Sequence, residues 1–314
     1  MQENSKELRV NSTRNESLSQ VTYTEEDVTK DMVARATAAI TQLWDDSRGT
    51  FWRSTEHRNR DESNSEGIDF FPTVSYKSTE ALIDLASRYP EWTRDETKRQ
   101  LTEIYIPKVL SHSLDEIDSS LDTTKQPGVQ NPFTISLYLI TLAKSVEIIR
   151  PNTKTLESML GQMASGIELL KGCCNDIDQT HPFIQFHILR AITTCLPILA
   201  KKIDPLNLQE LIRDTILNIR ISAKELLARH MLGQLSPSDA VALIFCAASL
   251  SRFEGDENTY YVLPALEVGF KAQDTSGCWP LGRVVHQDKD REGPRLEIST
   301  YEIAWAVSET LLGL

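Results

Sequence analysis

Five long segments of the sequence are apolar on most helical faces, and they recur at intervals of roughly 50 to 60 residues. They are residues 74–89, 131–149, 181–199, 236–253 and 297–314. A helix that is apolar all round is stable only when protein surrounds it, so these segments predict an inner layer of buried helices. Ser236 and Asp239 mark the start of the fourth helix. No strand-like alternation of useful length interrupts the pattern.

Amphipathic segments alternate with the apolar ones, and their predicted ranges are 24–43, 93–107, 156–170, 208–227 and 260–270. Thr93 and Glu96 form a capping-box pattern at the second of these starts, and Pro107 is expected to kink or shorten that helix. Gly172 and Gly233 are expected to end the third and fourth amphipathic helices. Each amphipathic helix therefore has one face for solvent and one for the inner layer.

This alternation predicts an all-α fold, because an outer helix with one wet face and an inner helix with neighbours all round are what a closed ring of helical hairpins needs. We expect an α/α toroid of about five outer–inner helical hairpins, forming one domain over residues 23–314. An open α-solenoid is the alternative. Residues 1–22 are polar and have little to bury, which indicates a flexible N-terminal arm.

Composition narrows the function classes. The formal net charge of the 314-residue chain is −12 and no basic run occurs, which argues against nucleic acid as a partner. No apolar run reaches the roughly 20 residues of a membrane span, so none is expected. The five cysteines lack the C-x2-C spacing of a zinc site, and no apolar leader precedes residue 23. We therefore expect a cytoplasmic protein without a bound metal.

The pattern D-x-x-G-x-aromatic occurs twice, 228 residues apart, in WDDSRGTFWRST (44–55) and AQDTSGCWPLGR (272–283). With Gln273, Gly277 and Trp279, the second copy resembles the QW motif, Q-x3-G-x-W, of the terpenoid cyclase and protein prenyltransferase superfamily of α/α toroids. In the first copy Asp45 takes the glutamine place and Phe51 the tryptophan place. The resemblance implies that both elements clasp adjoining helices, and a direct ligand contact by Trp279 is the alternative.

The resemblance also implies where catalytic groups would lie. Class II cyclases protonate an alkene with the middle aspartate of D-x-D-D or D-x-D-T-T, and the nearest matches here place Asp178 and Asp122 in that position. Each stretch lacks part of the pattern, so both aspartates are candidates for a degenerate acid site or simple loop acids. The aspartate-rich magnesium motif of class I enzymes is incomplete, and the family's zinc ligands have no counterpart. No cofactor is predicted.

A pair of glutamates offers another chemistry. Glu80 and Glu302 are predicted at matching first-turn positions of the first and last apolar helices, and closing the ring would make them neighbours. Two carboxylates across a cleft are the requirement of a glycan-active α/α-barrel enzyme. Helix capping is the alternative explanation for both residues.

Other polar and aromatic residues are candidates for contacts with a ligand. His187 and Arg190 share one face of an apolar helix, where an arginine needs a partner such as Asp178 or Glu80, or an open cavity. A buried structural ion pair is the alternative. The remaining candidates are aromatic or cationic residues expected near the mouth of the ring or in its last long loop: Tyr76, Lys77, Tyr138, Tyr301, Trp305, Arg283 and His286.

Together these features predict a non-catalytic or degenerate cyclase-like toroid that binds a small apolar ligand, a peptide or a partner protein through its central cavity or rim. The alternative is an enzyme of the cyclase or transferase type acting on an apolar substrate, or a glycan-active α/α-barrel enzyme. The incomplete initiator motifs favour the binding module, and fold alone does not decide between the two.

Overall fold

The computed structural model describes residues 25–52, 72–111, 132–174, 181–200, 205–254, 259–271, 273, 282–284, 296–298 and 300–312. Helices dominate these residues, so the prediction of an all-α fold is confirmed at that level. The candidates Asp122, Asp178, Trp279 and His286 lie outside the described residues, as does the whole predicted N-terminal arm.

The inner row consists of five helices: α3 (Pro72–Arg88), α7 (Pro132–Ile149), α9 (Pro182–Leu199), α11 (Pro237–Glu254) and α13 (Thr300–Leu312). Each corresponds to one of the five predicted apolar segments. The helices pack in chain order, each against the next, and nearly every side chain in the central turns of α7, α9 and α11 is buried. The hydrophobic core therefore runs along this row.

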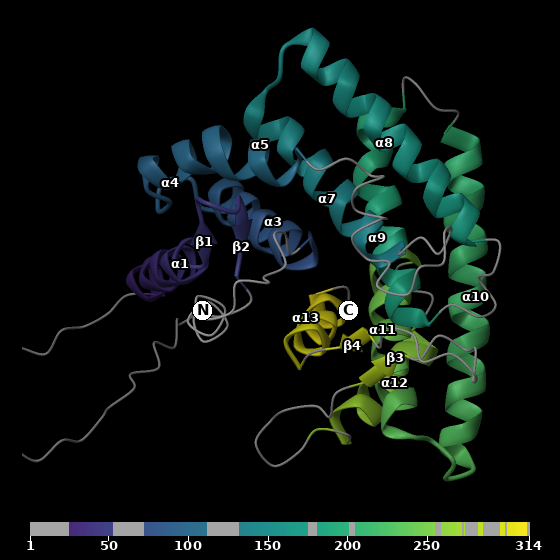
Figure 1. Cartoon of the computed structure of the whole chain (residues 1–314). Coiled ribbons are helices and arrows are strands. Elements are labelled where there is room, and N and C mark those ends of the chain that lie inside the picture. Colours follow the sequence, from purple (N-terminus) through teal and green to yellow (C-terminus); the bar gives the residue numbers. More distant parts are fainter. Residues whose placement is uncertain are drawn as a thin grey trace, which may run out of the picture.

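The outer elements flank the inner row. They are α1 (Glu25–Thr41), the run α4 (Asp95–Gln100), η1 (Leu101–Tyr105) and α5 (Ile106–Val109), then α8 (Thr153–Cys174), α10 (Pro205–Met231) and α12 (Thr259–Lys271). Helix α8 packs on α7 and α9, α10 packs on α9 and α11, and α12 packs on α11. The predicted alternation of outer and inner helices is therefore present in three dimensions (Figure 1).

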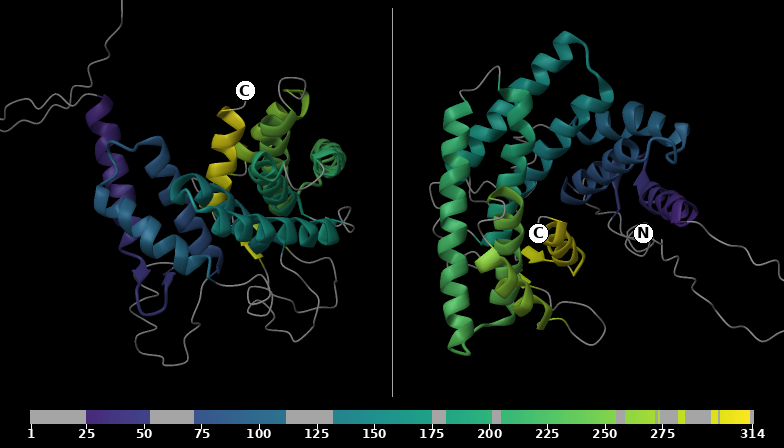
Figure 2. Two further views of the ribbon diagram at one scale, coloured as in Figure 1. Left: turned by 90° about the horizontal axis from the view of Figure 1, so that it is seen from above. Right: turned by 180° about the vertical axis from the view of Figure 1, so that it is seen from behind.

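The inner row is curved, so that its last helix, α13, turns back towards the side on which its first helix, α3, lies (Figure 2). Side chains of α13 nevertheless pack mainly on α11 and α9, and the described residues of α3 and α13 make no extensive contact with each other. The described part of the chain is therefore a curved double layer of helices.

The start of the second outer helix differs from the prediction. Helix α4 begins at Asp95 with Arg94 as its N-cap residue, so Thr93 and Glu96 do not form a capping box. The Thr93 hydroxyl instead donates to the carbonyl of Tyr89 at 3.0 Å, which ties the chain back to the preceding turn. The capping pattern failed because a hydroxyl can serve either neighbouring helix end, and packing selects one.

Pro107 was expected to kink or shorten this helix, but the helical run continues past it to Val109. The five residues before α5 form a π-helical turn, Leu101–Tyr105, within an otherwise α-helical run. Proline lacks the N–H that would bond the carbonyl four residues earlier, and its ring crowds that carbonyl, so a locally wider turn relieves both defects.

Two predicted helix ends had opposite outcomes. Gly233 follows α10 with φ +68°, and its N–H donates to the carbonyl of His230 at 2.9 Å, as a glycine at a helix C-terminus does. Gly172 does not end α8, which continues to Cys174. A glycine inside a helix costs only about 1 kcal/mol relative to alanine, which the packing of α8 outweighs.

At the start of α11 the prediction is confirmed: the Ser236 and Asp239 side chains cap each other's backbone N–H groups at 3.2 and 3.0 Å.

Two short antiparallel ladders interrupt the helices. β1 (Trp44–Asp45) pairs with β2 (Thr50–Phe51), and β3 (Gly282–Val284) pairs with β4 (Leu296–Ile298). Strands of two or three residues are too short to produce an alternation in the sequence, which explains why periodicity did not predict them.

Two of the inner helices, α7 and α9, are long and apolar enough to cross a membrane by length and composition. However, 67% and 72% of these segments, respectively, are buried within the protein, as is usual for core helices.

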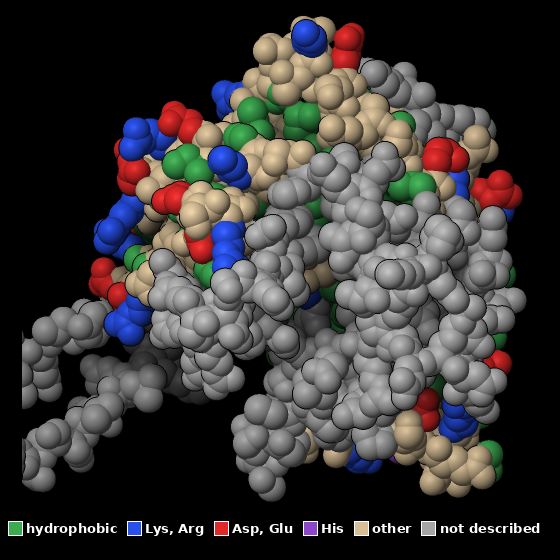
Figure 3. Space-filling model, viewed as in Figure 1, with side chains coloured by type: hydrophobic (Ala, Val, Ile, Leu, Met, Phe, Trp, Pro, Cys, Tyr) green, Lys and Arg blue, Asp and Glu red, His purple; other side chains and the backbone are tan. Residues whose placement is uncertain are grey.

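The surface over α1 and α4 carries acidic and basic side chains side by side (Figure 3).

Candidate functional site

Charged side chains of three inner helices meet between those helices. Glu80 of α3 accepts from Arg190 of α9, with 2.5 Å between Nη2 and Oε1, and from Lys144 of α7, with 2.8 Å between Nζ and the same oxygen. Lys144 also donates to both carboxylate oxygens of Asp84, at 2.7 and 2.8 Å. We call these four residues the central cluster.

The helical repeat explains how the central cluster is assembled. Glu80 and Asp84 are four residues apart and therefore lie on one face of α3, from which Lys144 can reach both. Arg190 is the only cationic residue within α9, a helix that is otherwise almost wholly apolar. Two acids and two bases balance the charge, which is the condition under which buried ionic groups are tolerated.

The electrostatics of Glu80 follow from this arrangement. Burial alone would raise the pKa of its carboxyl, but the charges of Arg190 and Lys144, with their hydrogen bonds, outweigh burial and lower the pKa below its usual value of 4.5. Glu80 is therefore an ionised acceptor at neutral pH. It does not have the raised pKa that a general acid needs.

Helix α13 joins the cluster through Trp305. The Arg190 guanidinium lies over the Trp305 ring, 4.2 Å from the ring centroid, and Phe186 contacts the same ring edge-on at 5.4 Å. This cation–π contact uses a face of the guanidinium that the ion pair with Glu80 leaves open. Side chains from α3, α7, α9 and α13 thus meet at one place.

His187 lies one turn before Arg190 and is fully enclosed by aromatic rings. Its imidazole centroid is 4.8 Å from the rings of both Phe133 and Phe183 and 5.8 Å from Trp305. Among the described residues neither ring nitrogen has a hydrogen-bond partner. Burial, and then the charges of Arg190 and Lys77, hold the pKa of His187 well below 6.5, so the imidazole is neutral.

Tyr76 is also a core residue. Its side chain is fully buried, its ring contacts Tyr138 edge-on at 5.6 Å, and the Thr141 hydroxyl donates to its backbone carbonyl at 3.2 Å. The Tyr138 hydroxyl donates to Gln162 of α8 at 2.8 Å, and burial raises the pKa of Tyr138 to about 12. Both tyrosines therefore connect helices within the core.

The predicted pairing of Glu80 with Glu302 needs correction. Helix α3 begins at Pro72, so Glu80 lies in its third turn, whereas Glu302 lies in the first turn of α13. The two positions therefore do not match, and the described acid that shares Lys144 with Glu80 is Asp84. Arg283 lies in β3 and Tyr301 in the first turn of α13, and the side chains of these residues and of Glu302 are outside the described part.

The first D-x-x-G-x-aromatic element is a hairpin held by Asp45. The Asp45 carboxylate accepts from the backbone N–H groups of Ser47 and Arg48 at 2.9 and 3.3 Å, and from the Trp52 indole at 3.0 Å. Although partial burial favours the neutral acid, these hydrogen bonds and that of the Ser47 hydroxyl lower the pKa of Asp45. Gly49 turns the chain with φ +65°, a conformation that only glycine adopts easily.

The same hairpin is fastened to its neighbours. Phe51 is fully buried and packs edge-on against Trp44 and Tyr105, with ring centroids 4.9 and 5.3 Å away. Its backbone N–H donates to the Ser75 hydroxyl of α3 at 3.2 Å. Residues 44–52 therefore join α3 and η1, in agreement with a clasp. For the second element, only Gln273 and residues 282–283 are described.

Sequence reasoning named Glu80 as one of two candidate partners of Arg190, beside Asp178, but did not consider Lys144 or Asp84. Lys144 was recognisable, because a lysine within an apolar helix raises the same question as Arg190 does in α9. Asp84 was also recognisable, because it is a second acid four residues after Glu80 and therefore lies on the same helix face. Neither signal identifies a partner, since that depends on which helices become neighbours.

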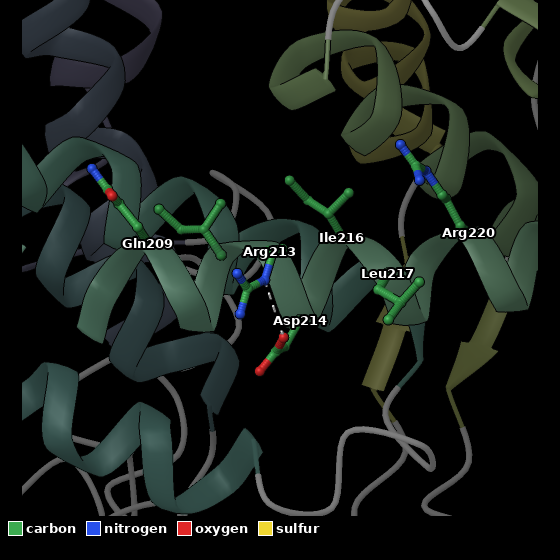
Figure 4. Close-up of a pocket in the computed structure, with 7 residues that line it drawn as sticks. Gln209, Arg213, Asp214, Ile216, Leu217 and Arg220 are labelled. Atoms are coloured by element: carbon green, nitrogen blue, oxygen red, sulfur yellow. Dashed lines mark ion pairs between the residues drawn. The ribbon is translucent and has the colours of Figure 1, made fainter. Parts of the chain in front are cut away.

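A cavity of about 490 Å³ lies away from the central cluster, along α10 (Figure 4). The described residues that line it are Gln209, Ile212, Arg213, Asp214, Ile216, Leu217 and Arg220. Within the described part of the chain, no three His, Cys, Asp or Glu side chains are grouped so that they could hold a metal ion.

Comparisons with known proteins assign no family to the chain: no family model, no curated protein and no solved structure matches it.

Proposed function

We propose that this protein is a non-catalytic α/α toroid of the terpenoid-cyclase type that acts as a binding module for a small apolar ligand, a peptide or a partner protein. One observation carries the proposal: the acid located between the inner helices, Glu80, is ionised and shared by Arg190 and Lys144. Such a group joins helices, and its lowered pKa is the opposite of what a proton-donating general acid needs.

The curvature of the inner row supports the toroidal arrangement. Arg190, on the third inner helix, contacts Glu80 on the first and Trp305 on the last. A straight row of helices would separate the first helix from the last by three intervening ones. The shared contact favours a ring with side chains converging on its centre over an open solenoid.

The edge of the central cluster is where a ligand is proposed to bind. Asp84 and Lys144 keep 41% and 23% of their side-chain surface exposed, whereas Glu80 and Arg190 are buried behind them. Trp305 is half-buried beside Arg190. A rim that combines an aromatic face with a few fixed polar groups suits an apolar ligand or a peptide with one cationic or hydrogen-bonding group.

A direct comparison separates this function from the enzymatic alternatives. The full chain is incubated with an acyclic polyprenyl diphosphate, with an oligosaccharide panel and with a peptide panel, and each compound is recovered and weighed by mass spectrometry. The binding module predicts that compounds are retained and released unchanged. A cyclised or hydrolysed product that disappears in Asp178→Asn or Asp122→Asn would show the degenerate-enzyme alternative to be right.

The location of the site is tested with a matched pair of variants. Asp84→Asn alters the proposed rim, and Asp31→Asn alters an exposed ion pair with Arg35 on α1. Compounds retained by the wild type are expected to bind Asp84→Asn more weakly and Asp31→Asn equally well. Equal retention by both variants argues against the rim as the binding site.

A further inference from the structure

Helix α10 has a second apolar stripe, whose described side chains are exposed. Its inner face is buried through Ile216, Ile219, Ala223 and Leu226, among others. Positions 217, 221, 224, 228 and 231, which we call the α10 seam, are all exposed and follow the 4-3-4-3 spacing of a coiled-coil seam.

The side chains of the α10 seam are mostly apolar and bulky. Leu217, Ile221 and Met231 are 52%, 47% and 86% exposed, and Leu232, directly after the helix, is 70% exposed. Single exposed leucines are ordinary on a protein surface, but a run of them at helical spacing is typical of a contact site for another helix.

Helix α12 extends this surface. Tyr260, Leu263 and Phe270 are 77%, 56% and 47% exposed, although the opposite face of α12 packs on α11. The two outer helices adjoin: the Lys224 ammonium lies 6.0 Å from the Tyr261 ring centroid. Each of these adjoining helices therefore exposes apolar side chains.

The cavity along α10 begins where the seam begins. Leu217 and Arg220 line it together with Ile216 and the Arg213–Asp214 ion pair (Figure 4). A hollow at one end of an apolar stripe gives a large anchoring side chain room to insert.

The charge along the seam is opposite in sign to that of the whole protein, which has a net charge of −12. Between Leu217 and Met231, α10 carries the cations Arg220, Lys224 and Arg229 and a single acid, Glu225. One of these cations, Arg229, pairs with Asp239 of α11 at 3.7 Å, so the excess of positive charge is small and centred near Lys224. A cationic stripe on an acidic protein favours an acidic partner, because complementary charge guides association and excludes like-charged proteins.

A second copy of this chain fits the seam poorly. Position 224 is the midpoint of the seam, so an antiparallel pairing of two α10 helices would place Lys224 opposite Lys224. A parallel pairing would also align identical residues. Both bring like charges together, which is unfavourable at the centre of an interface.

We propose that the outer face of α10, extended by α12, is a docking surface for an acidic amphipathic helix of a partner protein. The partner places apolar side chains at 3–4 spacing along the α10 seam and acidic side chains beside Lys224 and its cationic neighbours. The seam spans 14 residue steps, about 21 Å, which a helix of two to three heptads covers. This surface lies on the outer layer and does not depend on ligand binding at the central rim.

The proposal is tested with a fluorescent synthetic peptide of three heptads that carries leucine at the seam positions and glutamate beside them. A second peptide has lysine in place of every glutamate. Fluorescence anisotropy with the full chain is expected to show binding of the acidic peptide, stronger at low ionic strength, and little binding of the basic one.

Variants of the full chain identify the surface. Ile221→Glu and Leu217→Glu should each weaken binding of the acidic peptide about tenfold or more, because both lie in the seam. Met32→Glu is the matched control: Met32 is 65% exposed on α1, and its replacement should leave binding unchanged. Lys224→Glu should shift the preference towards the basic peptide. All four positions are exposed, so circular dichroism should show unchanged folding.

Three results would overturn the proposal. The first is failure of the acidic peptide to bind, or equal binding to wild type and Ile221→Glu. The second is wild-type self-association in sedimentation experiments that Ile221→Glu abolishes, which would identify a second copy as the occupant. The third is a wild type that binds vesicles of anionic phospholipid but not the acidic peptide, with vesicle binding lost in Ile221→Glu. That result would identify a membrane surface as the occupant.

Discussion

Replacing Glu80 by glutamine is expected to destabilise the protein by about 3 kcal/mol at neutral pH. The side chains of Glu80 and Arg190 are only 9% and 7% exposed, and removing one partner of a buried ion pair costs about 3 to 5 kcal/mol because the other charge stays buried. The lower end applies here, since the amide oxygen still accepts hydrogen bonds and Lys144 keeps Asp84 as a partner.

The loss should depend on pH in a direction that the structure fixes. The folded-state pKa of Glu80 is lowered from 4.5, so its carboxylate contributes stability that is fully present above pH 4.5. That contribution disappears as the pH falls through the folded-state pKa. The free energies of unfolding of wild type and Glu80→Gln should therefore differ most at pH 7 and converge in acid.

Urea denaturation followed by circular dichroism at several pH values measures both quantities. Asp84→Asn is the control, because Asp84 contacts the same lysine but is 41% exposed, and its loss should be about 1 kcal/mol or less. The reasoning fails if Glu80→Gln costs less than about 1 kcal/mol at pH 7, or if its deficit does not shrink in acid. Replacing Glu80 and Arg190 together by methionine should recover much of the loss.

Three further predictions concern other positions in the helices. Gly161→Ala should stabilise the protein by up to about 1 kcal/mol, because the added Cβ meets nothing within 4 Å. Gly166→Ala should destabilise it, because a side-chain carbon of Leu139 in α7 would lie 2.6 Å from the added Cβ; the melting temperatures of the two variants should therefore move in opposite directions. His187→Phe should be neutral or stabilising in urea denaturation, and a loss above about 2 kcal/mol would reveal a partner for the imidazole. Cys195 and Cys246 should resist alkylation until the protein unfolds, because burial raises the pKa of Cys195 to about 12 and that of Cys246 further; labelling of the folded chain, detected by mass spectrometry, would contradict this.

The helical organisation was largely predictable because burial leaves a local record. A segment such as residues 181–199 is apolar on every face only if protein surrounds it, and α9 occupies nearly the same range. Gly233 and the Ser236–Asp239 cap were predictable for a similar reason: each satisfies backbone groups within a few residues.

The failures share one cause, which is competition between local signals and packing. Thr93 was expected to cap the helix after it but bonds the one before it, and Gly172 was expected to end a helix that continues past it. Glu80 was placed in a first turn, but α3 begins at Pro72, so Glu80 lies in its third turn.

By itself, the sequence determined which segments are helical, their order and which of them lie inside, because each of these properties depends on side chains a few residues apart. It also showed that Arg190 needed a partner. Only the tertiary structure decided that the partner is Glu80, 110 residues away, and that Lys144 and Trp305 join them. Partners so distant in the chain meet only when whole helices pack, and packing depends on the shapes of many side chains at once.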